Sequence, residues 1–434
     1  ARAFTNKTDN VEIKASWCSG NVAMTAKSYL GTMCIGVAAT GVEGLKTIIP
    51  EAGISNWYDY YRCGGLTVPA LGWQGDDLDL LAKYCFSRAK DAADYAAVKD
   101  AYDAALAELR RGEDRASGNY NRFWDERNYL NLADRIRASV FIVHGLNDWN
   151  VKTNQCIPLF RELEKRGVPA KMMLHQGPHV YIHNLRDSNM LDILHRWLEH
   201  DLTGVDNGID REPAVLVESG ADQSVWMASE TWPPAGCREA EFPIPTRGRQ
   251  TVVDDLSQTA YDRKADNLKD WRDELVLNDN PEYRNRLKFV WNPFGEELAE
   301  DEAPLKTDST RQGLRISGTV KVSFDAAIDR ETAILSTMLV DLGASRRITE
   351  EEISHEDGTY SFGVEEVSSP YKVISRGWLN AQNRSCLWRK ERIVPGEMYH
   401  YEIDMVPTDY VLEPGHKLAL ILYGIDAEAT PRPD

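Results

Sequence analysis

The apolar pattern of this 434-residue chain changes near residue 205, and this change limits the folds that the chain can adopt. Up to residue 204, short apolar runs alternate with amphipathic segments of helical spacing. Strands that alternate with helices in this way favour a parallel sheet covered on both faces. The strands are predicted at residues 21–26, 46–50, 139–144 and 171–175, and the helices at 29–40, 154–166 and 184–202.

Residues 54–129 interrupt this alternation. An alanine-rich stretch at 91–111 has its apolar residues at helical spacing, and aromatic residues crowd both ends of the segment. The pattern predicts a mostly helical insertion that lies over the sheet. The alternative is an ordinary small helical domain with no part in a site.

After residue 205, helical patterns almost disappear and short alternating segments follow, separated by Gly, Pro, Asp and Asn. This spacing favours a two-sheet β-sandwich of jelly-roll type. We therefore expect an α/β domain at 1–204 and a β-sandwich at 205–434, with the acidic residues 296–302 in a solvated loop. The sandwich strands are predicted at 214–218, 224–228, 288–291, 314–324, 332–342, 371–379 and 418–423.

Charge and composition exclude several classes of function. The 68 Asp and Glu outnumber the 50 Lys and Arg, so the net charge of −18 argues against a nucleic-acid partner. No apolar run reaches the roughly 20 residues that cross a bilayer. The seven scattered cysteines, without a C-x-x-C pair, predict an intracellular protein without a zinc site. No phosphate-loop, dinucleotide or zinc-protease motif occurs, so neither cofactor nor metal is expected.

Ser28 lies in the sequence AKSYLG, between a predicted strand and a predicted helix. This is the context of a nucleophile elbow, in which the backbone N–H of the next residue, Tyr29, helps to form the oxyanion hole. The usual G-x-S-x-G pattern is not met, because Ala26 occupies the first glycine position and Gly31 follows three residues after the serine. The alternative is that Ser28 is only a helix N-cap.

Two further residues follow predicted strands in the order that a serine hydrolase requires. Asp148 comes after the strand at 139–144, and His179 comes after the strand at 171–175. The order Ser, Asp, His is that of the α/β-hydrolases. Because the carboxyl ends of parallel strands meet at one edge, we expect the three side chains to form a triad there. Taken singly, each could be a turn or surface-loop residue, and His144 and His175 are expected to be core or sheet-edge histidines.

An α/β-hydrolase places several strands before its nucleophile, whereas only 27 residues precede Ser28 here. We therefore expect a partial catalytic domain that lacks its early strands, in a longer natural polypeptide. The second oxyanion donor is then expected upstream of this chain, so that the 434 residues alone would have little or no activity.

Four motifs, at 26–31, 51–61, 144–152 and 177–181, resemble the X-prolyl dipeptidyl aminopeptidases of lactic acid bacteria. The similarity covers essentially the whole chain, although that family has Gly where Ala26 stands. The resemblance implies a cytoplasmic serine peptidase with an α/β-hydrolase fold, which removes X-Pro dipeptides from peptides with a free N-terminus. It also implies a homodimer in the full-length protein.

The resemblance further implies roles for individual residues. Ser28, Asp148 and His179 take the triad positions. The proline pocket and the site for the substrate's α-amine are assigned to residues that could instead be core aromatics or a helix N-cap. These residues are Trp57, Tyr60, Tyr29 and Val151 for proline, and Asp76 and Asn150 for the amine.

Two other functions remain open from the sequence. One is a hydrolase of acyl esters or acylamides, similar to the cocaine-esterase and α-amino-acid ester hydrolase group. The other is an inactive fragment whose β-sandwich serves as a binding module.

Overall fold

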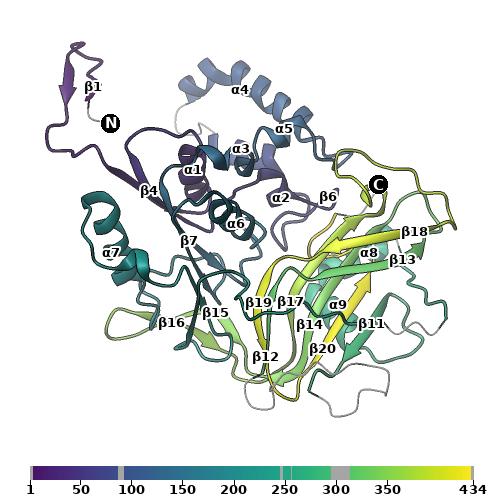
Figure 1. Cartoon of the computed structure of the whole chain (residues 1–434). Helices are drawn as coiled ribbons and strands as arrows, with labels where there is room; N and C mark the ends of the chain where they lie inside the picture. Colours follow the sequence, from purple (N-terminus) through teal and green to yellow (C-terminus); the bar gives the residue numbers. More distant parts are fainter. Residues whose placement is uncertain (1–2, 87–91, 245–247, 256, 295–312, 432–434) are drawn as a thin grey trace. The chain divides into compact units, whose positions relative to one another are not determined.

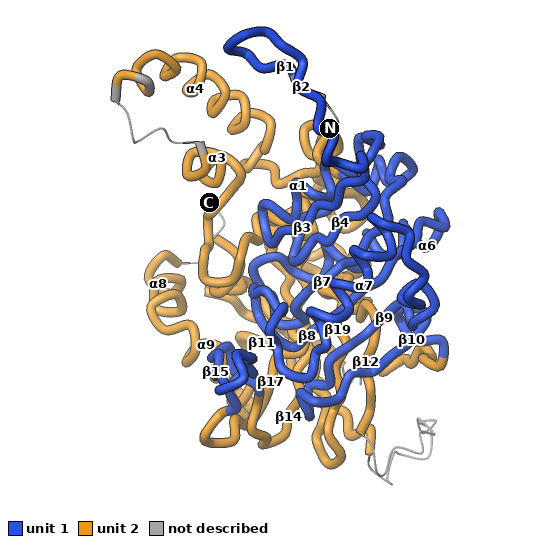
Figure 2. The backbone as a smooth tube through the Cα atoms, turned by 90° about the vertical axis from the view of Figure 1, so that its left-hand side faces the viewer, with its two compact units in different colours: residues 1–55, 129–235, 348–364 blue, residues 56–128, 236–347, 365–434 orange. Residues whose placement is uncertain are grey.

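The computed structural model describes residues 3–86, 92–244, 248–255, 257–294 and 313–431 (Figure 1). The chain divides into two compact units, each assembled from three separate segments (Figure 2). Unit 1 comprises residues 1–55, 129–235 and 348–364. Unit 2 comprises residues 56–128, 236–347 and 365–434.

Unit 1 is built on a six-stranded sheet. All neighbouring pairs are parallel except the last, in which β10 is antiparallel to β9. The order across the sheet is β10 (Trp226–Ser229), β9 (Val215–Glu218), β8 (Ala170–His175), β7 (Ser139–Gly145), β4 (Leu45–Glu51) and β3 (Val22–Lys27). The four strands predicted before residue 205 are all present.

Alternating side chains of these strands enter two separate cores, one on each face of the sheet. Val140 and Ile142 pack with residues of α1 (Tyr29–Ala38) and α6 (Cys156–Arg166). Phe141 and Val143 pack with residues of α7 (Met190–Thr203). Coverage by helices on both faces explains why β7 is buried at every position and why its central residues 140–143 are all apolar.

Helix α7 begins six residues later than the predicted start at residue 184. Asp187 and Asn189 adopt positive φ angles of 61° and 52°, which end any right-handed helix before them. The C-terminal end predicted for α6 at residue 166 is correct, and the end predicted for α7 at residue 202 is one residue short. Gly167 and Gly204 follow α6 and α7 in the left-handed conformation, at φ 67° and 76°.

The first sheet extends past the boundary expected at residue 205. The segments predicted as the first two sandwich strands are β9 and β10, and Met172 of β8 pairs with Val215 of β9. The hairpin of β15 (Ile348–Ser354) and β16 (Tyr360–Val364) also belongs to unit 1, where Phe362 enters the α7 core. Short alternating strands have the same sequence pattern in either sheet, so the pattern alone could not assign them.

Unit 2 contains two layers of β-structure. Its four-stranded sheet has the order β11 (Arg286–Trp291), β20 (Lys417–Tyr423), β14 (Ile334–Ser345) and β17 (Ser369–Asn380). One face packs against the antiparallel pairs β12 (Leu314–Gly318) with β19 (Thr408–Leu412) and β13 (Lys321–Ala327) with β18 (Met398–Asp404). The predicted strand 314–324 is therefore two strands. Residues 296–302, predicted as a loop, lie outside the described residues.

Two helices of unit 2 were not predicted, α8 (Gln258–Asp266) and α9 (Leu268–Leu277). Trp271 and Leu275 of α9 cover the second face of the four-stranded sheet, against Met338 and Ile421. The expectation that helices are rare after residue 205 is thus wrong for this segment. A polar N-cap, Asn267, accepts the N–H of Asp270 at the start of α9.

The insertion predicted at 54–129 is mostly helical, as expected, and its residues 56–128 are grouped with the β-rich part of the chain in unit 2. Backbone hydrogen bonds join them: Asn380 donates to Gly64 O at 2.8 Å and Gly72 donates to Glu428 O at 2.9 Å. Its elements are α2 (Trp57–Tyr61), β5 (Arg62–Cys63), β6 (Leu66–Thr67), α3 (Leu78–Phe86), α4 (Ala92–Glu113) and α5 (Arg122–Asp125).

The remaining elements are short, and they comprise β1 (Ala3–Thr5) paired with β2 (Glu12–Lys14), and the 3-10 helices η1 (Tyr129–Arg135), η2 (Ile209–Arg211) and η3 (Ala381–Asn383). Within the described ranges, every helix is too short or too polar to cross a membrane.

A buried ionic cluster holds the last strand of unit 2. Arg376 on β17 is 2% exposed, and it donates to Asp426 Oδ2 at 3.0 Å and to Glu428. Asp426 also accepts the indole N–H of Trp378 and the hydroxyl of Tyr423, at 2.9 and 2.7 Å. Removal of the guanidinium would take the cation from the buried carboxylate of Asp426 and leave Glu428 with Arg272 as its cationic partner.

We expect Arg376→Met to lower the free energy of unfolding by about 3–5 kcal/mol, measured by chemical denaturation. The control is Arg122→Met, which removes an exposed pair with Glu126 on α5 and should cost less than about 1 kcal/mol. Adding Asp426→Asn to Arg376→Met should recover part of the loss. Equal stability of the two single variants would contradict a structural role for the cluster.

Candidate active site

Ser28 occupies the turn between β3 and α1 in a strained conformation. Its φ and ψ angles are 62° and −130°, a region that residues with a side chain rarely adopt. The backbone is fixed by two hydrogen bonds, from Ser28 N to Glu51 O at 2.9 Å and from Thr32 N to Ser28 O at 2.8 Å. The hydroxyl makes no capping hydrogen bond to the helix, so Ser28 does not serve as a side-chain N-cap.

The turn is tight because α1 passes very close to the ends of β3 and β4. A Cβ atom on Gly31 would lie 2.8 Å from Ala26 O and 2.9 Å from Glu51 O, both backbone atoms. Only glycine fits this position without displacing a strand. Ala26, the departure from the family pattern, is accommodated because its methyl group packs against the core between the sheet, α1 and α6.

Asp148 and His179 are brought together by the ends of β7 and β8. His179 Nδ1 donates to Asp148 Oδ2 at 2.7 Å, and Asp148 is 3% exposed. The second oxygen, Oδ1, accepts the backbone N–H groups of Asn150 and Val151, at 3.0 and 2.9 Å. With Nδ1 protonated, His179 Nε2 is the atom that can accept a proton.

Lys27 joins the loop of His179 to the serine turn. Its ammonium donates to His179 O at 3.1 Å, and its backbone N–H donates to the hydroxyl of Tyr181, also at 3.1 Å. The residue directly before Ser28 thus contacts the histidine and a residue two positions beyond it. The structure brings all three segments of the expected triad to the same edge of the sheet.

Glu218 is a residue of this edge that the sequence did not single out. It ends β9, is 0% exposed, and accepts the backbone N–H of Gln176 at 2.7 Å, at the start of the histidine loop. The side-chain amide of Gln176 donates to Glu218 O at 2.8 Å. The backbone carbonyl of Gln176 accepts from the side-chain amide of Asn147, in the loop that carries Asp148, at 2.5 Å. The sequence contained one signal for Glu218, its position at the end of a predicted strand. Because that strand was predicted to belong to the sandwich, Glu218 was not expected at this edge.

His144 and His175 are buried histidines of the sheet edge, as expected. Burial lowers the pKa of both, and that of His175 falls to about 3, with His144 and His179 lowering it further. His144 Nε2 donates to Val151 O at 2.6 Å, and His175 Nδ1 accepts the N–H of Gly177 at 3.1 Å. Both are neutral at physiological pH and support the loops.

The residues expected to bind proline and the α-amine lie partly in unit 2. Trp57 and Tyr60 project from α2 with their rings edge to face, 6.1 Å between centroids, and Trp57 is 6% exposed. Asp76 is half-buried in the loop before α3, and burial raises the pKa of its carboxyl. The position directly before α3 is occupied by Asp77, whose backbone carbonyl accepts the N–H of Leu81 at 3.1 Å, so the N-cap position is that of Asp77 and not of Asp76.

Tyr29, Asn150 and Val151 lie in unit 1. Tyr29 is the first residue of α1, as the oxyanion hypothesis requires. Asn150 and Val151 follow Asp148 directly, and their backbone N–H groups hold its carboxylate. Among the described residues, no group of three or more His, Cys, Asp or Glu could hold a metal ion.

Family models match both halves of the chain. The model described as X-Pro dipeptidyl-peptidase (S15 family) matches residues 7–181, and the model of the X-Pro dipeptidyl-peptidase C-terminal non-catalytic domain matches residues 207–434. Relatives include the Xaa-Pro dipeptidyl-peptidases of Lactiplantibacillus plantarum, 39% identical, and Pediococcus pentosaceus, 36% identical. Each match covers 99% of this chain, and 54% and 55% of the relative. The chain therefore spans about half the length of these relatives.

Solved structures show the same fold at low identity. An aminopeptidase from a marine sediment Thaumarchaeota archaeon superposes with a TM-score of 0.58 and 14% identity, over 93% of this chain and 69% of that one. An α-amino acid ester hydrolase gives 0.57 and 16%, over 93% and 69%. A CocE/NonD family hydrolase from Staphylococcus aureus gives 0.56 and 12%, over 96% and 70%. The fold is that of the α/β-hydrolases with a β-rich C-terminal domain.

The buried carboxyl of Glu218 makes stability depend on pH. Burial raises its pKa from 4.5 to about 7, although the Gln176 N–H opposes the shift. Between these values the unfolded chain has lost a proton that the folded chain retains, so this group's contribution to stability falls as pH rises. We expect Glu218→Gln to remove a decline of about 2–3 kcal/mol between pH 4.5 and 7.5, measured by urea denaturation.

The exposed Glu230→Gln controls for the loss of a carboxyl at the surface. If wild type and Glu218→Gln lose stability in parallel over this range, Glu218 is not the titrating group.

Proposed function

The chain belongs to the X-Pro dipeptidyl-peptidase family S15, and on this basis we propose that the protein is a serine exopeptidase that releases X-Pro dipeptides from the N-termini of peptides. One observation carries the proposal. The strained Ser28 turn lies at the sheet edge where the Nδ1–H of His179 is held by the buried carboxylate of Asp148.

In the proposed mechanism Ser28 Oγ attacks the carbonyl carbon of the substrate's proline while His179 Nε2 removes the hydroxyl proton. Asp148 stabilises the imidazolium that forms. The N–H of Tyr29 donates to the developing oxyanion. His179 then protonates the leaving amine, and the remaining peptide departs from the acyl-enzyme. Water, deprotonated by the same imidazole, releases the X-Pro dipeptide and restores Ser28.

Substrate choice is assigned to residues with matching chemistry. A pyrrolidine ring is compact and lacks an N–H, so apolar and aromatic walls can enclose it without leaving a donor unpaired. We propose Trp57 and Tyr60, with Tyr29 and Val151, for this role. The α-ammonium of the substrate requires a carboxylate, for which we propose Asp76, assisted by Asn150.

Three finer proposals concern the whole protein. None of the seven cysteines, each of which lies in the described part of the chain, forms a disulfide bond, in support of a cytoplasmic location. The two β-layers of unit 2 support a jelly-roll sandwich. A homodimer is proposed from the family resemblance.

The test uses the protein expressed from its whole gene, assayed with Ala-Pro anilide. We expect turnover that Ser28→Ala lowers by about 10⁴-fold or more, because the nucleophile is lost. The matched control is Ser16→Ala, which alters an exposed serine and should retain full activity. A fluorophosphonate probe should label wild type and Ser16→Ala but not Ser28→Ala.

The choice of substrate separates the rival functions. N-acetylated Ala-Pro anilide should be cleaved far more slowly than the free amine. Equal turnover of both, or preference for simple esters, would assign the protein to the ester and acylamide hydrolases instead. If the fluorophosphonate probe labels no serine, the protein is not a serine hydrolase and the alternative of a binding module is favoured.

A further inference from the structure

We propose that Arg62 and Arg115 are positioning residues for Asp76, and that they set the separation between the site for the substrate's amine and the site for its proline. This inference rests on the roles proposed for Asp76, Trp57 and Tyr60. It concerns unit 2 alone, since all five residues belong to it.

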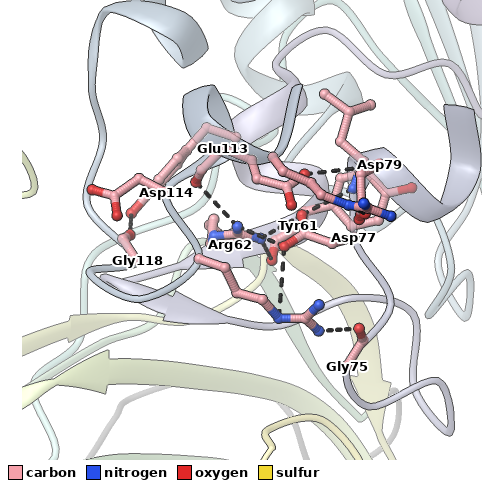
Figure 3. A network of polar contacts seen from close by, with 12 residues as sticks. Tyr61, Arg62, Gly75, Asp77, Asp79, Glu113, Asp114 and Gly118 are labelled. Carbon is pink, nitrogen blue, oxygen red and sulfur yellow. Dashed lines mark hydrogen bonds and ion pairs between the residues drawn. The ribbon is translucent and has the colours of Figure 1, made fainter. Parts of the chain in front are cut away.

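Arg62 forms a two-pronged ion pair with the neighbour of Asp76. Its Nη1 and Nη2 donate to Asp77 Oδ1 and Oδ2, at 2.9 and 2.8 Å, and both side chains are 0% exposed. Figure 3 shows this pair at the centre of the network, with Glu113 on the other side of the guanidinium. Arg62 Nη2 also donates to Glu113 O at 3.3 Å, and its guanidinium lies 5.1 Å from the ring centre of Trp124.

Arg115 holds the other side of Asp76. Its Nη2 donates to the carbonyl oxygen of Gly75, and its Nε lies 3.9 Å from Asp77 Oδ2. Asp76 is therefore bounded on both sides by a residue that an arginine contacts. Its own backbone N–H donates to Trp73 O at 3.0 Å, so the main chain at Asp76 is fixed while the carboxyl remains half-buried.

The base of the network is formed by α3 and α4. Glu113 accepts the backbone N–H of Asp79 at 3.1 Å, and Arg110 donates to Asp79 Oδ2 at 2.6 Å (Figure 3). The carbonyl of Glu113 also accepts the indole N–H of Trp124 at 3.2 Å. Several elements thus fix the carboxylate of Asp77, so it cannot follow a displacement of Asp76 without breaking buried charge contacts.

The pair connects the two halves of the proposed dipeptide site. Arg62 directly follows Tyr61, the last residue of α2, which carries Trp57 and Tyr60. Asp77 directly follows Asp76. The ion pair between Arg62 and Asp77 thus joins the end of the helix that would bind proline to the residue beside the carboxylate that would bind the ammonium. A site with this separation fixed accepts an ammonium one residue before proline.

The experiment compares two substrates in the protein expressed from its whole gene. Ala-Pro anilide carries the ammonium, and propionyl-Pro anilide is the same molecule without it. We expect Arg115→Ala and Arg62→Lys to raise KM for Ala-Pro anilide by about tenfold, with kcat changed less than about twofold, since a charge-assisted hydrogen bond is misplaced. For propionyl-Pro anilide, kcat/KM should stay at the wild-type value. The loss of affinity would then be specific to the substrate's ammonium group.

Arg115 is 42% exposed, so its variant keeps the test valid even if Arg62→Lys fails to fold. The control is Arg122→Ala on α5, an exposed arginine of the same unit. It should leave both substrates unaffected. Asp77→Glu with Arg62→Lys should partly restore the preference, because the longer carboxylate can reach the shorter cation.

The outcomes distinguish this inference from the proposed function. If wild type does not prefer Ala-Pro over propionyl-Pro anilide, the role of Asp76 fails and the inference fails with it. If wild type shows the preference and Arg115→Ala and Arg62→Lys retain all of it, only the positioning role is wrong. Equal losses on both substrates would indicate a general structural role and would also overturn the inference.

Discussion

The close approach of helix α1 to the ends of β3 and β4 is the constraint on which the candidate active site depends. At Gly31 there is no space for a single additional carbon atom. Because α1 lies this close to the strand ends, the chain leaves β3 at Lys27 and enters α1 at Tyr29, with one residue between them. Ser28 is that residue, and its positive φ is the result. The hydrogen bond from Ser28 N to Glu51 O fixes the turn to the end of β4, so the strained backbone of Ser28 cannot relax.

Buried carboxylates organise the loops around this turn in different ways. Asp148 is held by two backbone N–H groups and directs its other oxygen to an imidazole. Glu218 accepts one backbone N–H and joins the histidine loop to the last parallel strand. Asp77 is held by the guanidinium of Arg62, a contact that we propose fixes the position of the neighbouring Asp76. Each of these carboxylates lies at or near the end of a regular element, where a small displacement would move a side chain of the proposed site.

The sequence predicted the part of the structure that follows from periodicity. Asp148 and His179 were expected together because parallel strands direct their following loops to one edge, and that inference needed no knowledge of the loops. The sheet to which residues 214–228 belong could not be predicted, because two alternating strands pair equally well in a sandwich. Arg62 and Asp77 are fifteen positions apart across β5, β6 and a loop, and only the path of that loop brings them together.

Assembly from interleaved segments has a consequence for biosynthesis. The last segment of unit 1 ends at residue 364, whereas unit 2 also requires β20, an inner strand of its four-stranded sheet that is synthesised later. Domains generally fold as units while the chain is being made. Trp57 and Tyr60 thus remain without the rest of unit 2 until β20 has been synthesised, whereas the segments of unit 1 that carry Asp148 and His179 are available before it.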